Sequence, residues 1–237
     1  MEFPDNWERY EFAAGFVKGR RVVDVACGCG YGTALLGVAS GLRPIGLDVS
    51  SEAIAWARQY YGATADYERI QPSLTWPVPD AGADVVISLE TVEHVPDADE
   101  FLTEIARVLP PGGELILSTP CCDSEARFRP ENPFHLREYS WTELAELLGR
   151  NGFQVLDRWS QVSALSARWA QVKASSTGPL LVGFKGLFPR SWVDSCRSFL
   201  ARRSRLKKGS IVHGRVDAVA VQLVRARLAD KRKRLHG

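Results

Sequence analysis

The stretch that most constrains the fold is residues 22–33, Val-Val-Asp-Val-Ala-Cys-Gly-Cys-Gly-Tyr-Gly-Thr. Its β-branched apolar start leads into three glycines at alternate positions, and an Ala-Leu-Leu segment follows. This order predicts a buried strand, a tight turn and the first turn of a helix. Glycine costs a strand or helix about 0.5–1 kcal/mol relative to alanine, so three glycines together indicate a sharp bend or a ligand close to the backbone. An ordinary strand-to-helix turn is the simpler alternative.

Strand-like and helix-like segments alternate along the first two-thirds of the chain. Further strands are predicted at residues 44–49, 66–71, 84–89 and 114–119. Helices are predicted at residues 6–18, 33–40, 51–60, 99–109 and 141–150. Such alternation predicts a doubly wound, mostly parallel α/β sheet, in which ligands bind beyond the carboxyl ends of the strands. Residues 153–160 and 217–225 are expected to add a final antiparallel pair, which makes a Rossmann-like sheet of seven strands.

The chain divides into four predicted parts. They are a core at 1–160, an inserted helical cap or lid at 161–215, the last strand of the core sheet at 216–226 and a basic tail at 227–237. Residues 185–237 contain 15 Lys and Arg against 3 Asp and Glu, whereas the rest of the chain contains 15 against 25. One interpretation is a lid that meets an anionic headgroup or membrane surface. The other is a helix with a solvated basic face.

Composition narrows the classes of protein to consider. The 237 residues are 45% hydrophobic and 24% charged, as in globular proteins with a full core. The five cysteines follow no zinc-site or disulfide pattern, and the first residues lack a signal-peptide pattern. We therefore expect a cytoplasmic protein, with or without a peripheral contact at the inner face of the membrane. No basic stretch is interleaved with aromatic residues, so a nucleic-acid partner is not expected.

Several motifs, in this order, resemble those of class I S-adenosylmethionine (SAM)-dependent methyltransferases. Residues 22–33 are similar to the first motif of that family, and Asp48 matches its ribose-binding acid. Residues 84–97 resemble the fourth-strand motif, and residues 106–115 resemble the signature between the next helix and the fifth strand. Residues 132–139, Asn-Pro-Phe-His-Leu-Arg-Glu-Tyr, are similar to a loop of bacterial members associated with glycan and small-molecule O-methylation. The resemblance implies SAM as methyl donor and S-adenosylhomocysteine as product.

The resemblance also implies a set of cofactor contacts. Gly28 and Gly30 let the backbone approach the methionine part of SAM, and Asp24 either holds its ammonium group or braces the turn. Asp48 accepts hydrogen bonds from the ribose hydroxyls. The family's acid after the third strand is absent, and its place falls at Gln71, whose carboxamide oxygen can accept a hydrogen bond from the adenine amino group. The predicted cofactor-binding residues are Tyr10, Asp24, Cys27, Gly28, Gly30, Asp48, Val49, Gln71 and Leu89.

A hydroxyl acceptor must be aligned with the methyl group and must lose its proton. An imidazole accepts a proton near neutral pH, so His94, just past the fourth strand, and His135, in the loop over the same rim, are the candidate catalytic bases. The alternative is a structural role, in which His94 braces the start of a helix and His135 braces the loop. The predicted acceptor-binding residues are Glu90, Glu93, Asn132 and Tyr139. No metal is predicted, although Glu90, Glu93 and Asp97 offer oxygen ligands to a hard divalent cation.

These features favour an enzyme that O-methylates a sugar, a glycan or a related small metabolite. N- or C-methylation of another small molecule or a lipid-linked acceptor is the alternative among enzymes. A protein that binds SAM as a scaffold, without turnover, is the alternative outside enzymes. The glycine turn alone would also suit a dinucleotide-dependent dehydrogenase.

Overall fold

The computed structural model of the chain describes residues 3–71, 75–121, 133–161, 169–171 and 220–230. Its helices are α1 (Phe3–Ala14), α2 (Tyr31–Ser40), α3 (Ser51–Tyr61), the short 3-10 helix η1 (Val92–His94), α4 (Ala98–Val108) and α5 (Trp141–Arg150). Its strands are β1 (Val22–Val25), β2 (Ile45–Asp48), β3 (Asp66–Arg69), β4 (Val85–Leu89), β5 (Glu114–Cys121), β6 (Phe153–Gln161), β7 (Trp169–Gln171) and β8 (Ala220–Leu228).

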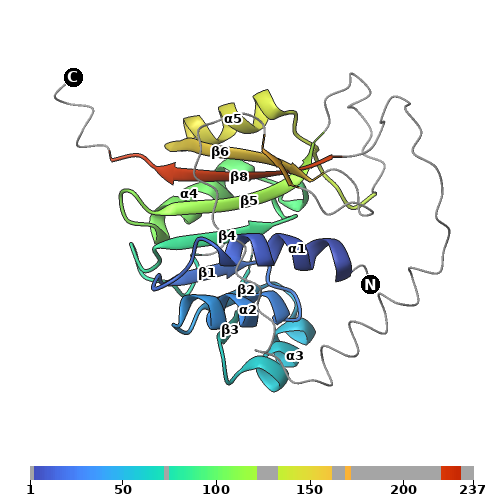
Figure 1. Cartoon of the computed structure of the whole chain (residues 1–237), viewed down its shortest axis with the longest axis vertical. Coiled ribbons are helices and arrows are strands. Elements are labelled where there is room, and N and C mark those ends of the chain that lie inside the picture. The colour runs from blue at the N-terminus through green and yellow to red at the C-terminus, as the bar shows by residue number, and fades with distance from the viewer. Residues whose placement is uncertain (1–2, 72–74, 122–132, 162–168, 172–219, 231–237) are drawn as a thin grey trace. The chain divides into compact units, whose positions relative to one another are not determined.

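The strands form one sheet in the order β3-β2-β1-β4-β5-β8-β6-β7 (Figure 1). Strands β1 to β5 pair in parallel, whereas β8 runs antiparallel to both β5 and β6. The expected doubly wound sheet and its final antiparallel pair are confirmed, with the short β7 added beside β6. The chain leaves β1 toward β2 on one side and reaches β4 on the other, so the point where strand order reverses lies between β1 and β4.

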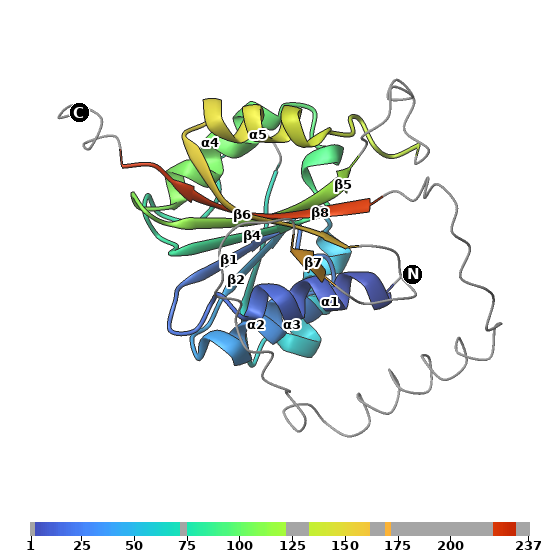
Figure 2. The same cartoon turned by 45° about the horizontal axis from the view of Figure 1, so that its top comes forward.

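Helices cover both faces of the sheet. Figure 2 shows α1, α2 and α3 on one face and α4 and α5 on the other. Every residue of β1 and β4 is buried, as expected of apolar strands that are covered on both sides. Because β1, β2, β4 and β5 are parallel, their carboxyl ends meet at one edge of the sheet, and this edge positions the candidate site.

Local signals set the start of three helices. The Ser50 hydroxyl accepts a hydrogen bond from the Ala53 amide at the start of α3, as its N-cap position requires. Asp97 caps α4, and Ser140 forms the expected capping box with Glu143 at the start of α5. The first helix begins at Phe3 and ends at Ala14, earlier than expected, because Gly15 turns the chain there.

Most of the predicted cap lies outside the described residues, as do its basic helix, His213 and residues 231–237 of the tail with His236. The last strand, β8, ends at Leu228, two residues inside the predicted tail. Within the segment 161–215 the structure describes Gln161, the end of β6, and the strand β7, which pairs with β6. The basic cap and its anionic partner therefore stay predictions. Among the described residues, no helix is both long enough and apolar enough to cross a membrane.

Candidate functional site

Three residues of the glycine turn between β1 and α2 have a positive φ. Ala26 has a φ of 60°, Gly28 of 55° and Gly30 of 84°. A Cβ atom on Gly28 would meet nothing within 4 Å, so this part of the turn faces open space. A Cβ on Gly30 would lie 2.6 Å from the Ala57 Cβ and from the Tyr67 ring, so this part packs against the protein. One side of the turn is therefore fixed and the other is open to a ligand.

Asp48 lies at the carboxyl end of β2, directly beside that turn. Its Oδ2 accepts a hydrogen bond of 2.8 Å from the Gly28 amide, and its Oδ1 accepts one of 2.8 Å from the Ser50 amide. Both oxygens are thereby held in place by backbone donors, while the side chain stays partly exposed. A carboxylate oriented in this way can accept further hydrogen bonds from two neighbouring hydroxyls.

Asp24 lies on β1 and is fully buried beneath the turn. Its carboxylate accepts a 2.6 Å hydrogen bond from the Thr33 hydroxyl and 3.2 Å hydrogen bonds from the Tyr10 hydroxyl. Burial raises the pKa of Asp24 from 3.8 to about 7, the two hydrogen bonds oppose this rise, and the charge of Asp48 adds to it. Tyr10, a predicted cofactor-binding residue, is buried; its hydroxyl contacts Asp24 and its ring packs on Gly32.

This raised pKa predicts a pH-dependent stability. The folded protein binds the Asp24 proton more tightly than the unfolded chain does, so the free energy of unfolding without ligand falls as pH rises from about 4 to about 7. Asp24→Asn removes this loss. Its stability advantage over the wild type should grow by about 2–3 kcal/mol between pH 5 and pH 8 in urea unfolding. An advantage that stays constant across that range would contradict a titrating, buried Asp24.

The remaining predicted cofactor residues lie along the same sheet edge. Leu89 ends β4 and is buried, whereas Val49 and Gln71 follow β2 and β3 and are exposed. The Cys27 side chain is buried on the protein side of the turn, which leaves only its backbone for a ligand. Asp66 begins β3, at the opposite end of the strand, and pairs with Arg43 at 2.6 Å. It therefore does not replace the missing acid near Gln71.

Glu90 directly follows β4, at the carboxyl end of that strand. Its φ of 53° is unusual for a residue with a side chain. The Ser118 hydroxyl donates a 2.8 Å hydrogen bond to Glu90 Oε1, and Arg9 of α1 lies 3.6 Å from Oε2. Strained residues of this kind cluster at functional sites. Arg9 and Ser118 are contacts that the sequence did not reveal, because they come from α1 and β5.

Glu93 is fully buried in η1. Its Oε2 accepts a 2.9 Å hydrogen bond from the Thr119 hydroxyl, while Oε1 has no hydrogen-bond partner among the described residues. Burial and the nearby charge of Glu90 raise the pKa of Glu93. The Glu93 carbonyl accepts hydrogen bonds from the Leu136 and Arg137 amides, which attach the loop 133–139 to η1.

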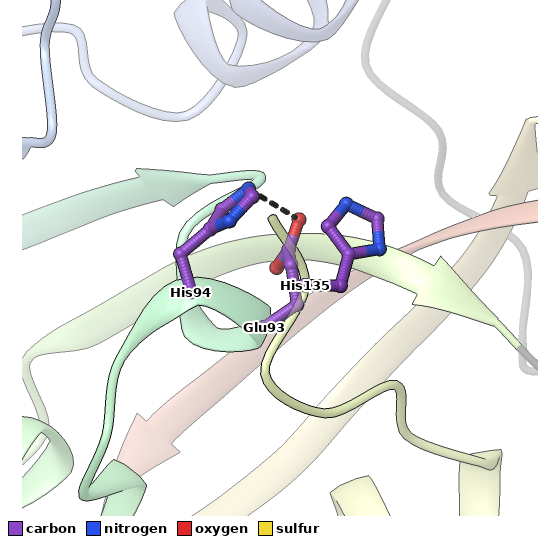
Figure 3. A group of neighbouring side chains, drawn as sticks. All are labelled: Glu93, His94 and His135. Carbon is purple, nitrogen blue, oxygen red and sulfur yellow. Dashed lines mark ion pairs between the residues drawn. The ribbon is translucent and has the colours of Figure 1, made fainter. Parts of the chain in front are cut away.

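This attachment brings His94 and His135 together, with ring centroids 4.9 Å apart (Figure 3). His94 Nδ1 lies 2.9 Å from the Phe134 carbonyl oxygen, and His135 Nδ1 lies 2.8 Å from Glu138 Oε1. Both partners are acceptors, so each Nδ1 carries the proton and donates it. In the neutral rings, Nε2 then carries the lone pair.

Two other predicted site residues, Tyr139 and Asp97, have structural roles. Asn132 falls outside the described residues. The Tyr139 ring is buried in the hydrophobic core with Leu144, so it is a poor candidate for acceptor contact. Asp97 accepts hydrogen bonds from the Asp99 and Glu100 amides as the N-cap of α4.

Residues 23–117, which include β1, the glycine turn and Asp48, match the model of the methyltransferase domain family. This region of the chain is therefore a methyltransferase domain. This domain implies SAM as its cofactor, and the open side of the turn with the oriented Asp48 fits that ligand.

Known proteins with related sequences support the same assignment. The chain is 39% identical over 150 residues to a probable SAM-dependent methyltransferase of Mycolicibacterium smegmatis, an alignment that covers 62% of this chain and 57% of that protein. It is 30% identical over 149 residues to an O-methyltransferase of Penicillium expansum, covering 59% of this chain and 54% of that protein. The chain thus spans little more than half the length of these relatives.

The methyltransferase fold is also found in solved structures of low sequence identity. The structure of a 4+2 cyclase aligns with a TM-score of 0.62 at 18% identity. The alignment covers 94% of this chain and 81% of the cyclase chain. A likeness at this level of identity shows the fold alone. The proposal for the chemistry therefore depends on the residues of this site.

Proposed function

We propose that the protein is an enzyme that transfers the methyl group of SAM to a hydroxyl of a sugar, a glycan or a related small metabolite. The observation that carries this proposal is the contact between His94, in η1 just past β4, and His135, in the loop 133–139. The similarity to an O-methyltransferase over the domain supports oxygen as the acceptor atom.

On the donor side, residues of the chain would hold SAM and orient it. SAM, when bound, supplies a methyl group on a positively charged sulfur. Asp48 would accept hydrogen bonds from the ribose hydroxyls, the open face of Gly28 would receive the methionine part, and Asp24 would lie near its ammonium group. Such fixed positioning supplies much of the rate acceleration in a transfer of this kind.

On the acceptor side, the hydroxyl oxygen would form its bond to the methyl carbon as its proton passes to an imidazole Nε2. His135 is the stronger candidate for this base, because the carboxylate of Glu138 fixes the tautomer and orientation of its ring. His94 Nδ1 contacts a neutral carbonyl instead, and the His94 side chain is more exposed. Glu90 and Glu93 are the proposed contacts for the acceptor's other polar groups.

Replacing the proposed base should separate turnover from cofactor binding. His135→Ala should lower kcat by about 100-fold or more, because general-base catalysis contributes about 10²–10⁴-fold. The affinity for S-adenosylhomocysteine in calorimetry should stay within about 3-fold of the wild-type value, since His135 is not among the proposed cofactor contacts. Glu146→Gln on the exposed face of α5 is the matched surface control. Full turnover in both His135→Ala and His94→Ala would exclude a histidine base.

The acceptor class can be tested with matched pairs of compounds. Mono- and oligosaccharides are each incubated with enzyme and SAM beside their fully O-methylated counterparts, which lack free hydroxyls. Mass spectrometry should detect S-adenosylhomocysteine and a methyl ether only with the free-hydroxyl member. Transfer to amines alone would instead indicate N-methylation, and cofactor binding without any product would favour a scaffold.

A further inference from the structure

Three potential metal ligands meet at the rim of the proposed acceptor site. Glu93 and His94 come from η1, and His135 comes from the loop 133–139 (Figure 3). One ligand atom of each residue lies within 4.8 Å of those of the other two. Nitrogen and oxygen ligands bind zinc and similar divalent metals at about 2.0–2.2 Å. Ligand atoms around one such ion therefore lie roughly 3 Å apart. The limit of 4.8 Å is more than half as large again as this spacing, so side-chain rotations would have to close the group around an ion.

The burial of Glu93 is the first independent observation that favours a cation at this group. Its side chain is fully buried, yet Oε1 has no hydrogen-bond partner among the described residues. The His94 Nε2 atom lies 3.9 Å from this oxygen. A buried carboxylate oxygen without a partner carries a desolvation cost that a cation would offset.

The second observation is the way in which both imidazoles are held. Histidines that bind metals almost always donate their other ring N–H to a carbonyl or a carboxylate, which fixes the tautomer and the ring orientation. His94 Nδ1 makes such a contact with the Phe134 carbonyl at 2.9 Å, and His135 Nδ1 makes one with Glu138 at 2.8 Å. In both rings, Nε2 is then the nitrogen whose lone pair would bind a metal.

We propose that Glu93, His94 and His135 bind a divalent cation of the first transition series, such as Zn²⁺, Fe²⁺ or Co²⁺. Two imidazoles with one carboxylate suit these ions, whereas Mg²⁺ and Ca²⁺ prefer all-oxygen sites. Of the three carboxylates that the sequence offered as oxygen ligands, only Glu93 belongs to this set. Asp97 caps α4, and Glu90 Oε1 is bonded to Ser118.

This inference rests on the proposed O-methylation and changes how the acceptor proton is lost. Three protein ligands leave coordination positions open for a hydroxyl oxygen of the acceptor. A hydroxyl bound to a divalent cation has a lowered pKa, so its proton can pass to water while the oxygen bonds to the methyl carbon and the carbon–sulfur bond breaks. With the cation in place, the two imidazoles are ligands and no longer act as bases.

Cobalt provides a direct test that does not depend on activity. The full chain, stripped with a chelator, is titrated with Co²⁺ and followed by visible absorption. We expect one Co²⁺ per chain, displaced by Zn²⁺. Glu93→Gln and His135→Ala should each weaken Co²⁺ binding by more than about 100-fold, and Glu138→Gln by about 10-fold, as is typical when a partner of a metal ligand is lost.

The matched control is Asp97→Asn. It removes a nearby carboxylate but keeps the helix cap, because asparagine caps helices as well as aspartate does. Its Co²⁺ affinity should stay within about 2-fold of the wild-type value. Circular dichroism and thermal melts of each variant show whether it is folded, and Glu93→Gln should fold because it keeps the shape of the buried side chain while removing its charge.

The outcomes separate the cation site from the proposed function. Absence of Co²⁺ binding, or binding that persists in folded Glu93→Gln, overturns the cation site. If methyl transfer to hydroxyls still occurs and resists chelators, the proposed function stands with a histidine base. If Co²⁺ binds as expected but no hydroxyl is methylated in the acceptor panel, the cation site stands and the proposed function fails.

Discussion

Asp48→Ala should weaken the binding of S-adenosylhomocysteine by about 100-fold or more. Its carboxylate is oriented by amides of Gly28 and Ser50, each at 2.8 Å, so it meets a ligand's hydroxyls without reorganising. Hydrogen bonds to a charged group contribute about 1.5–3 kcal/mol each, and two of them lost together exceed the 2.7 kcal/mol that corresponds to 100-fold. Isothermal titration calorimetry measures the change directly.

Two variants make this test specific. Asp48→Asn keeps one acceptor oxygen and should bind with an intermediate affinity. Asp66→Asn removes a carboxylate from the amino end of the neighbouring β3, where it pairs with Arg43, and should leave the affinity unchanged. Equal affinities in the wild type and in Asp48→Ala would show that the ribose contact is misplaced.

Gly30→Ala should destabilise the fold by about 3 kcal/mol or more. The φ of 84° disfavours a side chain by about 1–2 kcal/mol, and the new Cβ would lie 2.6 Å from both the Ala57 Cβ and the Tyr67 ring. Overpacking of a rigid core adds about 1–3 kcal/mol. The Tyr67 hydroxyl also donates a 2.8 Å hydrogen bond to the Gly30 carbonyl, so the ring cannot move away without losing it. Urea unfolding gives the difference.

Gly41→Ala and Gly28→Ala separate the cost of a side chain at positive φ from the cost of overpacking. Both positions have a positive φ, and a Cβ at either would meet nothing within 4 Å, so each should lose only about 1–2 kcal/mol. Gly41 ends α2 away from the turn, and its variant should bind S-adenosylhomocysteine normally. Gly28→Ala should bind weakly, because its Cβ would occupy the open side. A Gly30→Ala variant as stable as Gly41→Ala would contradict the packing of the turn.

The fold follows from features that are local in the sequence. Continuous apolar runs such as 84–89 specify strands covered on both sides, and caps such as Ser50 and Ser140 specify where helices begin. The short β7 gave no such signal, since its three residues are a strand only through pairing with β6. Asp48 was identifiable for the same local reason, because an acid that ends the second strand must lie beside the first turn.

The acceptor side is harder to predict, because its residues meet through tertiary structure. Forty-one positions separate His94 from His135, and the loop is attached by the Glu93 carbonyl, which no sequence pattern identifies. The burial of Glu93 is likewise visible only in the folded protein. Tyr139 had a readable signal that was missed. It precedes the N-cap Ser140, and this position commonly packs against the fourth helical residue, here Leu144.

A structure of the protein with S-adenosylhomocysteine bound tests the central claim most directly. The account predicts that the ribose hydroxyls contact Asp48, that the amino acid part lies over Gly28 and that the sulfur faces Glu93, His94 and His135. A ligand bound elsewhere on the sheet, or one whose sulfur faces away from this histidine pair, would contradict it.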